Sequence, residues 1–287
     1  EATHRAFEAA EASGMRVVMG KVLMDRNAPE PLLEPVDEAI ADSLALAERW
    51  EGAGGGRLGY AITPRFALSC SAEMLAAAGR AAVDADLKVQ THLAEQPEEV
   101  AAVADRFPDA ADYLEVYERA GLVKPGAVFA HAVHCSDDAY RRLAAGGGAI
   151  ACCPTSNAFL GSGAFPLARA RAAGVTIGVG SDVGAGPQFS PLDVLRHLAH
   201  LDRLAGEELL YRGTAAGAEA LGLDELTGRI EPGLGADLVV LEPPDDATGS
   251  PLERFVQSVF RQPETRVAAT LVDGRPIHGS LPGEASG

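Results

Sequence analysis

Apolar segments rich in β-forming residues alternate with alanine-rich segments of helical periodicity along most of the chain, and this alternation constrains the fold most strongly. The apolar segments span residues 16–25, 58–66, 87–95, 126–134, 147–157 and 175–184. The expected helices lie near residues 34–50, 71–85, 97–120, 136–146 and 164–173, with two more within 190–221. Strands that alternate with helices predict a parallel sheet with helical crossovers, and therefore an α/β fold.

Polar or chemically reactive side chains lie at the end of each predicted strand, whereas the strand starts are apolar. These side chains are Lys21, Asp25, Arg65, His92, Glu95, His131, Asn157 and Asp182. A (β/α)8 TIM-type barrel assembles its active site from the C-terminal ends of several strands, and the chain fits that arrangement. A doubly wound open sheet is the alternative fold, but no glycine-rich phosphate loop follows the first predicted strand.

The sequence pattern changes after residue 225. Residues 227–243 and 266–279 form short, glycine-punctuated strand segments, separated by a loop near 243–252 that contains Pro and Asp. We therefore predict two units, a barrel domain over residues 1–225 and part of a small β-sandwich subdomain over residues 226–287.

The balance of charge narrows the classes of partner. The formal net charge is −17, from 41 acidic and 24 basic side chains, which repels nucleic acid and anionic lipid. No segment reaches the roughly 18 apolar residues that span a bilayer. The four cysteines, Cys70, Cys135, Cys152 and Cys153, have no disulfide-framework spacing, so we expect a reducing, cytoplasmic compartment. A small-molecule substrate fits these properties best.

Ionisable groups that could perform chemistry occur at three of the predicted strand ends. His92 and Glu95 follow one strand, His131 ends the next, and Asp182 lies in a Gly-Ser-Asp turn after the last. Imidazole and carboxylate groups are the zinc ligands where no thiolate is used, and a further carboxylate can accept a proton from an activated water. Taken singly, each histidine could be a structural, hydrogen-bonded residue and the Asp a turn cap. Their joint occurrence at successive strand ends favours a metal-dependent site.

Several motifs resemble those of the guanine deaminases of the amidohydrolase superfamily. THLAE, FAH, CPTSN and GSDVGAG follow one another as they do in that family, over nearly the whole chain from about residue 3 to 279. TPRFALSCS resembles the segment that contacts the purine, and GRIEPGLGADLVVLE resembles a strand of the β-subdomain. MDRN at 24–27 and SNAFLGSG at 156–163 also match.

The resemblance implies roles for the ionisable residues. His92 would be a zinc ligand, and Asp182 a second ligand that also holds the attacking water. Glu95 would carry the proton from that water to a ring nitrogen, and His131 would stabilise the charge that develops at the reacting centre. One Zn²⁺ per active site is implied.

The resemblance also implies a substrate-binding pair. Arg65 would hydrogen-bond the carbonyl edge of the purine, and Phe66 would pack on its ring, together with Glu95 and His131. The alternatives are an ion-paired arginine at a strand end and a plain core aromatic. His134 matches a family position, where a structural role is favoured, and Cys152 stands where the family commonly has a histidine.

The implied activity is the hydrolytic deamination of guanine to xanthine and ammonia, by a hydrolase acting on C–N bonds of cyclic amidines. We also expect a homodimer. One rival is another deaminase or chlorohydrolase of the superfamily that acts on an amino-heterocycle such as a triazine or pterin. A rival of another class is a non-catalytic remnant that binds a purine.

The first strand of the superfamily barrel ends in an HxH pair that supplies two more zinc ligands, and the sequence contains no HxH. The resemblance begins near the helix before the third barrel strand. We therefore expect a (β/α)8 barrel that lacks its first two strands, an N-terminal truncation of roughly a hundred residues by the usual size of such barrels. With two of four ligands, this fragment should be inactive alone.

Overall fold

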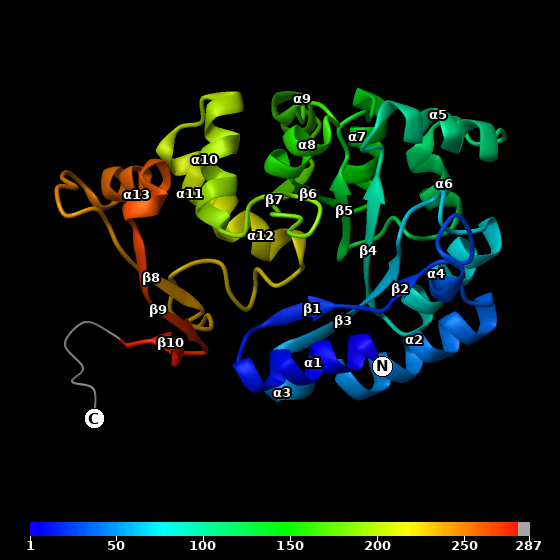
Figure 1. The fold of residues 1–287 in the computed structure, drawn as a ribbon, viewed down its shortest axis with the longest axis horizontal. Coiled ribbons are helices and arrows are strands. Elements are labelled where there is room, and N and C mark those ends of the chain that lie inside the picture. The colour runs from blue at the N-terminus through cyan, green and yellow to red at the C-terminus, as the bar shows by residue number, and fades with distance from the viewer. Residues whose placement is uncertain (281–287) are drawn as a thin grey trace.

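The computed structural model describes residues 1–280, and its main feature is a parallel sheet (Figure 1). Residues 281–287, the end of the predicted subdomain, lie outside the described residues. The sheet contains β1 (Val17–Met19), β2 (Val22–Leu23), β3 (Leu58–Pro64), β4 (Lys88–Leu93), β5 (Ala127–His131), β6 (Ala149–Cys152) and β7 (Thr176–Val179). Its strand order is β1-β3-β4-β5-β6-β7, with β2 also paired to β3.

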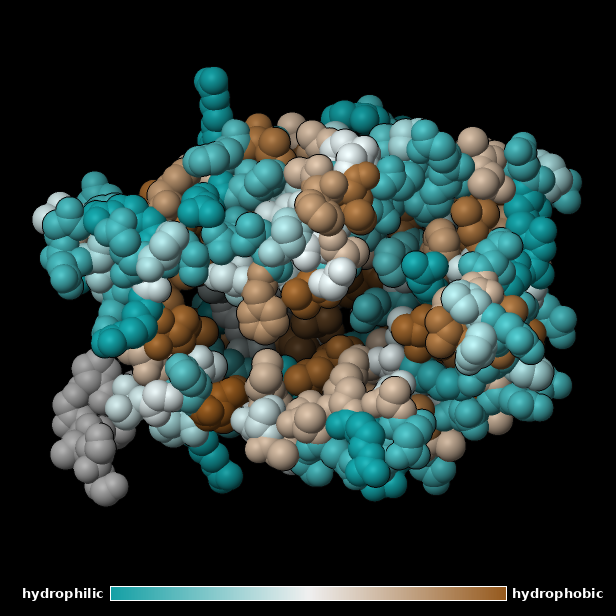
Figure 2. Space-filling model, in the orientation of Figure 1, coloured by the Kyte–Doolittle hydropathy of each residue, from teal (hydrophilic) through white to brown (hydrophobic). Residues whose placement is uncertain are grey.

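The strands therefore follow one another around the sheet in chain order, without the reversal that defines a doubly wound sheet. This winding, together with the curl of the sheet into a half-barrel, confirms the predicted barrel-type α/β fold. The path runs from β1 to β7 within residues 1–280, so these two strands form its open edges. Figure 2 shows the molecular face hollowed near its centre, with hydrophobic side chains deep in the hollow.

The first predicted strand, 16–25, is divided into β1 and β2 by a break at Gly20 and Lys21. A Cβ on residue 20 would lie 1.7 Å from the carbonyl oxygen of Ala61, so the two backbones approach too closely for any side chain. The backbone N–H of Lys21 donates at 3.0 Å to the side-chain hydroxyl of Tyr60 in β3 instead of to a backbone carbonyl of that strand. Both halves still pair with β3 in parallel, so together they act as one barrel strand.

Helices cover the outside of the sheet, and Figure 1 shows α1 and α2 beside β1 and β3. They are α1 (Ala2–Ser13), α2 (Val36–Trp50), α3 (Ala53–Gly56), α4 (Ala72–Asp84), α5 (Pro97–Arg106), α6 (Tyr113–Arg119), α7 (Asp137–Ala145), α8 (Pro154–Leu160), α9 (Leu167–Ala172), α10 (Pro191–Asp202), α11 (Gly206–Gly213) and α12 (Ala215–Ala220), with 3₁₀ turns at Glu30–Leu32 and Gln262–Glu264. Large apolar side chains of sheet and helices, among them Ile62, Met74 and Phe129, are fully buried between the two layers.

Three helix boundaries differ from the sequence prediction. The predicted strand 147–157 ends at Cys152, because Pro154 begins α8 with the preset φ of a first helical residue. The predicted helix 97–120 is two helices, and the side chain of Asp112 caps the second by accepting from the N–H of Glu115. The segment 190–221 holds three helices instead of two, since Thr214 leaves helical geometry between α11 and α12.

The C-terminal part contains an antiparallel sheet of β8 (Leu238–Glu242), β9 (Arg266–Val272) and β10 (Arg275–Gly279). The expected loop near 243–252 leads into a helix, α13 (Pro251–Phe260), which the sequence prediction missed. Ser250 and Glu253 form a capping box at its start, and α13 packs against α10 and α11. The proposed domain boundary at 225/226 stays a prediction.

Candidate active site

His92 lies near the C-terminal end of β4, where its ring contacts the end of β3. Its Nδ1 lies 2.8 Å from the carbonyl oxygen of Arg65. A carbonyl oxygen can only accept, so Nδ1 carries the ring proton and Nε2 keeps its lone pair. Burial lowers the pKa of His92, and the neighbouring His131 lowers it further. The neutral ring that results, with one free lone pair, is the form that binds a metal ion.

His131 ends β5 on the strand next to β4 and is 1% exposed. Its Nδ1 lies 2.9 Å from Oδ1 of Asn157, so it donates to that amide oxygen. Its ring stacks on the ring of His92, with centroids 5.3 Å apart. Its Nε2 points toward Oε2 of Glu95 at 3.7 Å. The ends of β4 and β5 thus bring His92, Glu95 and His131 together.

Glu95 and Asp182 each accept a hydrogen bond from a serine. Ser162 Oγ donates to Glu95 Oε1 at 2.9 Å, and Ser156 Oγ donates to Asp182 Oδ2 at 2.6 Å. Asp182 follows β7 with a left-handed φ of 50°, which a non-glycine residue adopts only when its surroundings hold it there. Within residues 1–280, no three His, Cys, Asp or Glu side chains gather closely enough to hold a metal ion.

Arg65 and Phe66 follow β3 and lie beside the histidine pair. The guanidinium of Arg65 sits 4.7 Å from the centroid of the Phe66 ring, and that ring is 6.2 Å from the ring of His92. Arg65 is exposed, Phe66 is half-buried, and Arg65 Nη1 donates to Ser69 Oγ at 3.3 Å. Among residues 1–280 no acidic side chain pairs with Arg65, so its remaining donors can reach a ligand. The purine-binding role of this pair stays a prediction.

The MDRN segment holds the loop that carries Arg65 and Phe66. The backbone N–H groups of Asp25 and Arg26 donate to the carbonyl oxygen of Ser69 at 3.1 and 3.3 Å. Asn27 Nδ2 donates to the carbonyl oxygen of Leu68 at 2.6 Å. The motif therefore acts through the backbone of this loop, a function that its sequence alone did not reveal.

Three polar side chains of the site were not assigned a role from the sequence: Ser156, Asn157 and Ser162. All three belong to the SNAFLGSG segment, which was noted as a family motif, and Asn157 was also noted as a polar side chain at a predicted strand end. The signal was therefore in the sequence, but the partner of each side chain became identifiable only in the folded chain.

The cysteines and His134 take no direct part in the cluster. Burial raises the pKa of the Cys153 thiol to about 12 and also raises that of Cys152, so both thiols stay protonated at neutral pH. His134 Nε2 donates to the carbonyl oxygen of Ser162 at 2.8 Å, which gives this histidine a structural contact near the site.

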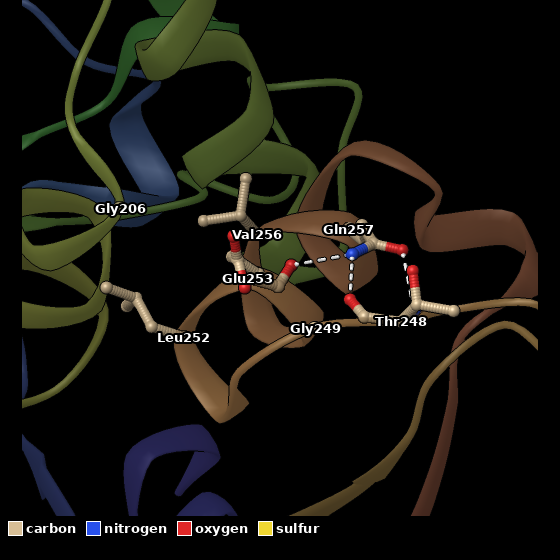
Figure 3. A pocket seen from close by; sticks show the side chains of 7 residues that line it. All are labelled: Gly206, Thr248, Gly249, Leu252, Glu253, Val256 and Gln257. Carbon is tan, nitrogen blue, oxygen red and sulfur yellow. Dashed lines mark hydrogen bonds between the residues drawn. The ribbon is translucent and has the colours of Figure 1, made fainter.

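A cavity of about 470 Å³ lies elsewhere, between α13 and the start of α11. Figure 3 shows that its polar groups bond one another: Gln257 Nε2 donates to the carbonyl oxygen of Thr248 at 2.8 Å, and the Thr248 N–H donates to Gln257 Oε1. Glu253 is engaged in the cap of α13. This cavity holds none of the reactive residues at the strand ends, so they remain the candidate site.

Comparison with known proteins gives a consistent set of matches. Residues 1–277 match the profile of the Amidohydrolase family. A guanine deaminase of Escherichia coli K12 is 43% identical over 280 residues, which are 95% of this chain and 62% of that protein. The chain thus spans less than two thirds of the length of this curated relative. No helix within residues 1–280 is long and apolar enough to cross a membrane.

Solved structures agree with the sequence matches. A structure of E. coli guanine deaminase superimposes with a TM-score of 0.91 at 39% identity, covering 97% of this chain and 68% of that chain. A guanine deaminase of C. acetobutylicum, solved with guanine bound in its active site, gives 0.88 at 26% identity, with coverages of 96% and 68%. An atrazine chlorohydrolase of Arthrobacter aurescens complexed with zinc gives 0.81 at 24% identity, with coverages of 96% and 64%, and shows a likeness of fold alone.

Proposed function

The chain belongs to the amidohydrolase family, and from this premise we propose that it forms the larger part of a zinc-dependent guanine deaminase. The observation that carries the proposal is the cluster of His92, Glu95 and His131, flanked by Arg65 and Phe66, at adjoining strand ends. The 43% identity to a guanine deaminase supports guanine as the substrate. The reaction adds water to guanine and releases ammonia, leaving xanthine.

The donors present are suited to zinc, although they are too few. His92 Nε2 has a free lone pair, and the bond from Ser156 leaves Oδ1 of Asp182 available. We propose that these two residues hold Zn²⁺ together with an HxH pair, which the 287 residues do not contain. A bound zinc ion lowers the pKa of water toward about 7 and so supplies the nucleophile at neutral pH.

The remaining steps use side chains of this chain. Glu95 accepts the proton of the attacking water and delivers it to a ring nitrogen of the purine, using Oε2, which Ser162 leaves unoccupied. His131 stands 3.7 Å from that oxygen and stabilises charge at the reacting carbon. Arg65 donates to the purine carbonyl oxygen, and Phe66 packs against the ring.

The test supplies the absent ligands. A segment with the HxH pair that the family resemblance implies is joined to this chain, and the product is called the completed protein below. Loss of guanine absorbance and release of ammonia are measured, with adenine and cytosine as competing substrates. We expect guanine turnover far above that of the other two, and none by the 287-residue chain alone. The matched control replaces both HxH histidines by glutamine.

Two results would redirect the assignment. Preferred turnover of an amino-triazine would identify another amino-heterocycle as the substrate, and guanine binding without turnover would support a non-catalytic purine-binding remnant. One tightly held zinc ion per 287-residue chain would contradict the proposal that His92 and Asp182 need an additional HxH pair to hold zinc. A homodimer in the cytoplasm stays part of the proposal.

A further inference from the structure

Three side chains of α8 and the turn after it each hydrogen-bond one of the residues proposed above for catalysis. Ser156 donates to Asp182 at 2.6 Å, Asn157 accepts from His131 at 2.9 Å, and Ser162 donates to Glu95 at 2.9 Å. We propose that these three side chains, here called the α8 clamp, form one positioning element that orients all three groups for reaction. The inference rests on the proposed function and assigns residues that act through those groups.

Each bond of the α8 clamp takes one of two polar atoms and leaves the other for chemistry. Ser162 occupies Oε1 of Glu95 and leaves Oε2, which faces Nε2 of His131 at 3.7 Å. Asn157 accepts the hydrogen bond from Nδ1 of His131 and so leaves Nε2 for the reaction. Ser156 occupies Oδ2 of Asp182 and leaves Oδ1. A carboxylate or imidazole held through one atom presents the other in a fixed direction.

The direction of the Ser162 hydrogen bond is set by its second partner. Gln96 Nε2 lies 2.9 Å from Ser162 Oγ and can only donate, so the single hydroxyl proton of Ser162 goes to Glu95. The amide orientation of Gln96 is consistent with its 3.5 Å contact from Nε2 to the carbonyl oxygen of Leu160. Glu95 therefore accepts this hydrogen bond through Oε1, and Oε2 stays available to the substrate.

The α8 clamp is buried, and hydrogen bonds hold the turn that follows α8. Ser156, Asn157 and Ser162 are between 0% and 1% exposed. Gly161 ends α8 with a left-handed φ of 73°, which lets the N–H of Ser162 return to the carbonyl oxygen of Asn157 at 2.8 Å. His134 holds the same turn from outside by donating to the carbonyl oxygen of Ser162.

Left-handed backbone conformations occur at two of the three held groups and directly beside the third. His131 and Asp182 have left-handed φ values of 69° and 50°, and Ala94, next to Glu95, has 45°. Non-glycine residues take this conformation only when the surrounding structure holds them in it, and the α8 clamp supplies such contacts. Asn157 Nδ2 is buried without a partner among residues 1–280, so the side-chain amide is held through Oδ1 alone.

The first test measures guanine deamination by the completed protein with Ser162→Ala. We expect kcat to fall about 10- to 100-fold, the range for residues that orient reactive groups, while KM changes little. Ser162→Thr keeps the hydroxyl and should recover most of kcat. Thr155→Val is the matched control, because Thr155 lies in α8, is 5% exposed, and its hydroxyl has no partner within the described residues. An unchanged kcat in Ser162→Ala overturns the inference while the proposed function stands.

The second test uses the 287-residue chain and needs no turnover. The ring N–H of His131, protected by Asn157, should give a slowly exchanging downfield proton NMR signal, identified by its loss in His131→Gln. We expect Asn157→Ala to abolish this signal, and Asn157→Asp and Thr155→Val to keep it. Loss of the signal in Asn157→Ala without deamination by the completed protein would support the clamp and overturn the proposed function. A signal that survives Asn157→Ala overturns the clamp.

Discussion

Two of the clusters in which charged side chains meet are built differently. At the strand ends, Glu95 faces His131 at 3.7 Å and is bonded by the neutral hydroxyl of Ser162. At the junction between the start of β1 and the C-terminal sheet, Arg16 lies between two aspartates. Its Nε contacts Asp237 Oδ2 at 2.6 Å and its Nη2 contacts Asp273 Oδ1 at 2.7 Å.

The difference shows how the same residue types can support either reactivity or stability. At the junction, opposite charges meet at hydrogen-bonding distance, so the folded state favours the charged forms and gains stability. At the strand ends, each reactive group keeps one atom unpaired and is bonded through another atom to a neutral side chain of α8 or of the turn after it. That arrangement retains reactivity at the expense of stability. Substitutions in the two clusters should therefore separate activity from folding.

The largest expected effect is that of Glu95→Gln in the completed protein. Gln keeps the shape and can still contact Ser162, but it cannot take a proton at neutral pH. We expect kcat to fall by about 10²- to 10⁴-fold, with zinc content, guanine binding and Tm nearly unchanged. Steady-state kinetics, metal analysis and thermal unfolding measure the three quantities. If the variant kept more than about a tenth of kcat, Glu95 would not be the proton shuttle.

Asp182→Asn should differ from Glu95→Gln by losing zinc, because the free carboxylate oxygen of Asp182 is a proposed zinc ligand. We expect zinc affinity in the completed protein to fall by at least about 10- to 100-fold, the range seen even for residues that only support ligands. Zinc retained after dialysis against a mild chelator is the measurement, with Glu95→Gln as the matched carboxylate-to-amide control. Equal zinc in both variants would remove Asp182 from the ligand set.

Much of the fold was predictable from the sequence, because strand ends and helix periodicity repeat at every unit of a barrel. The predictions failed where one residue decides a boundary. Pro154 begins a helix inside a segment that reads as a continuous strand. Ser250 and Glu253 begin α13 in a segment that composition marks as a loop. Caps act over three or four residues, so a pattern averaged over a longer window does not detect them.

The candidate site was predictable in its reactive residues but not in their supports. His92, Glu95 and His131 were found from strand-end positions and family motifs, and the folded chain brings them together. The partner of Ser162 is 67 residues away in the sequence. A serine hydroxyl fits many local partners, so its choice of Glu95 depends on how α8 packs, which no short motif encodes.

At the junction we expect the opposite of the Glu95→Gln result, a loss of stability without a loss of activity. Arg16→Gln removes the charge shared by Asp237 and Asp273 and should lower the free energy of unfolding by about 1.5–3 kcal/mol, the usual range for hydrogen bonds to charged groups. The activity of the completed protein should be unchanged. Urea unfolding of the 287-residue chain measures the stability. Arg266→Gln is the control, because its pair with Glu242 is exposed on both sides and should contribute less than about 1 kcal/mol. Equal losses in both variants would mean that the junction is an ordinary surface pair.

The smallest effect is the pH dependence of that loss, and it separates charge from packing at the junction. Burial raises the pKa of Asp237, whereas hydrogen bonds from Arg16 and from the N–H of Asp273 lower it. The lowering is the larger effect, so the pKa lies below its ordinary value overall. A carboxyl with a lowered folded-state pKa contributes stability above its unfolded pKa of about 3.9, and this contribution is lost as the pH falls through the folded-state value. The cost of Arg16→Gln should therefore be full at about pH 7 and should shrink below about pH 4, as Asp237 takes up a proton in both proteins. Urea unfolding of wild type and variant at several pH values gives the difference directly, with Arg266→Gln expected to stay small throughout. If the loss of unfolding free energy in Arg16→Gln stayed constant below about pH 4, the stability would come from packing of the Arg16 side chain. The contrast between a junction held by charge and a site held by neutral side chains would then fail.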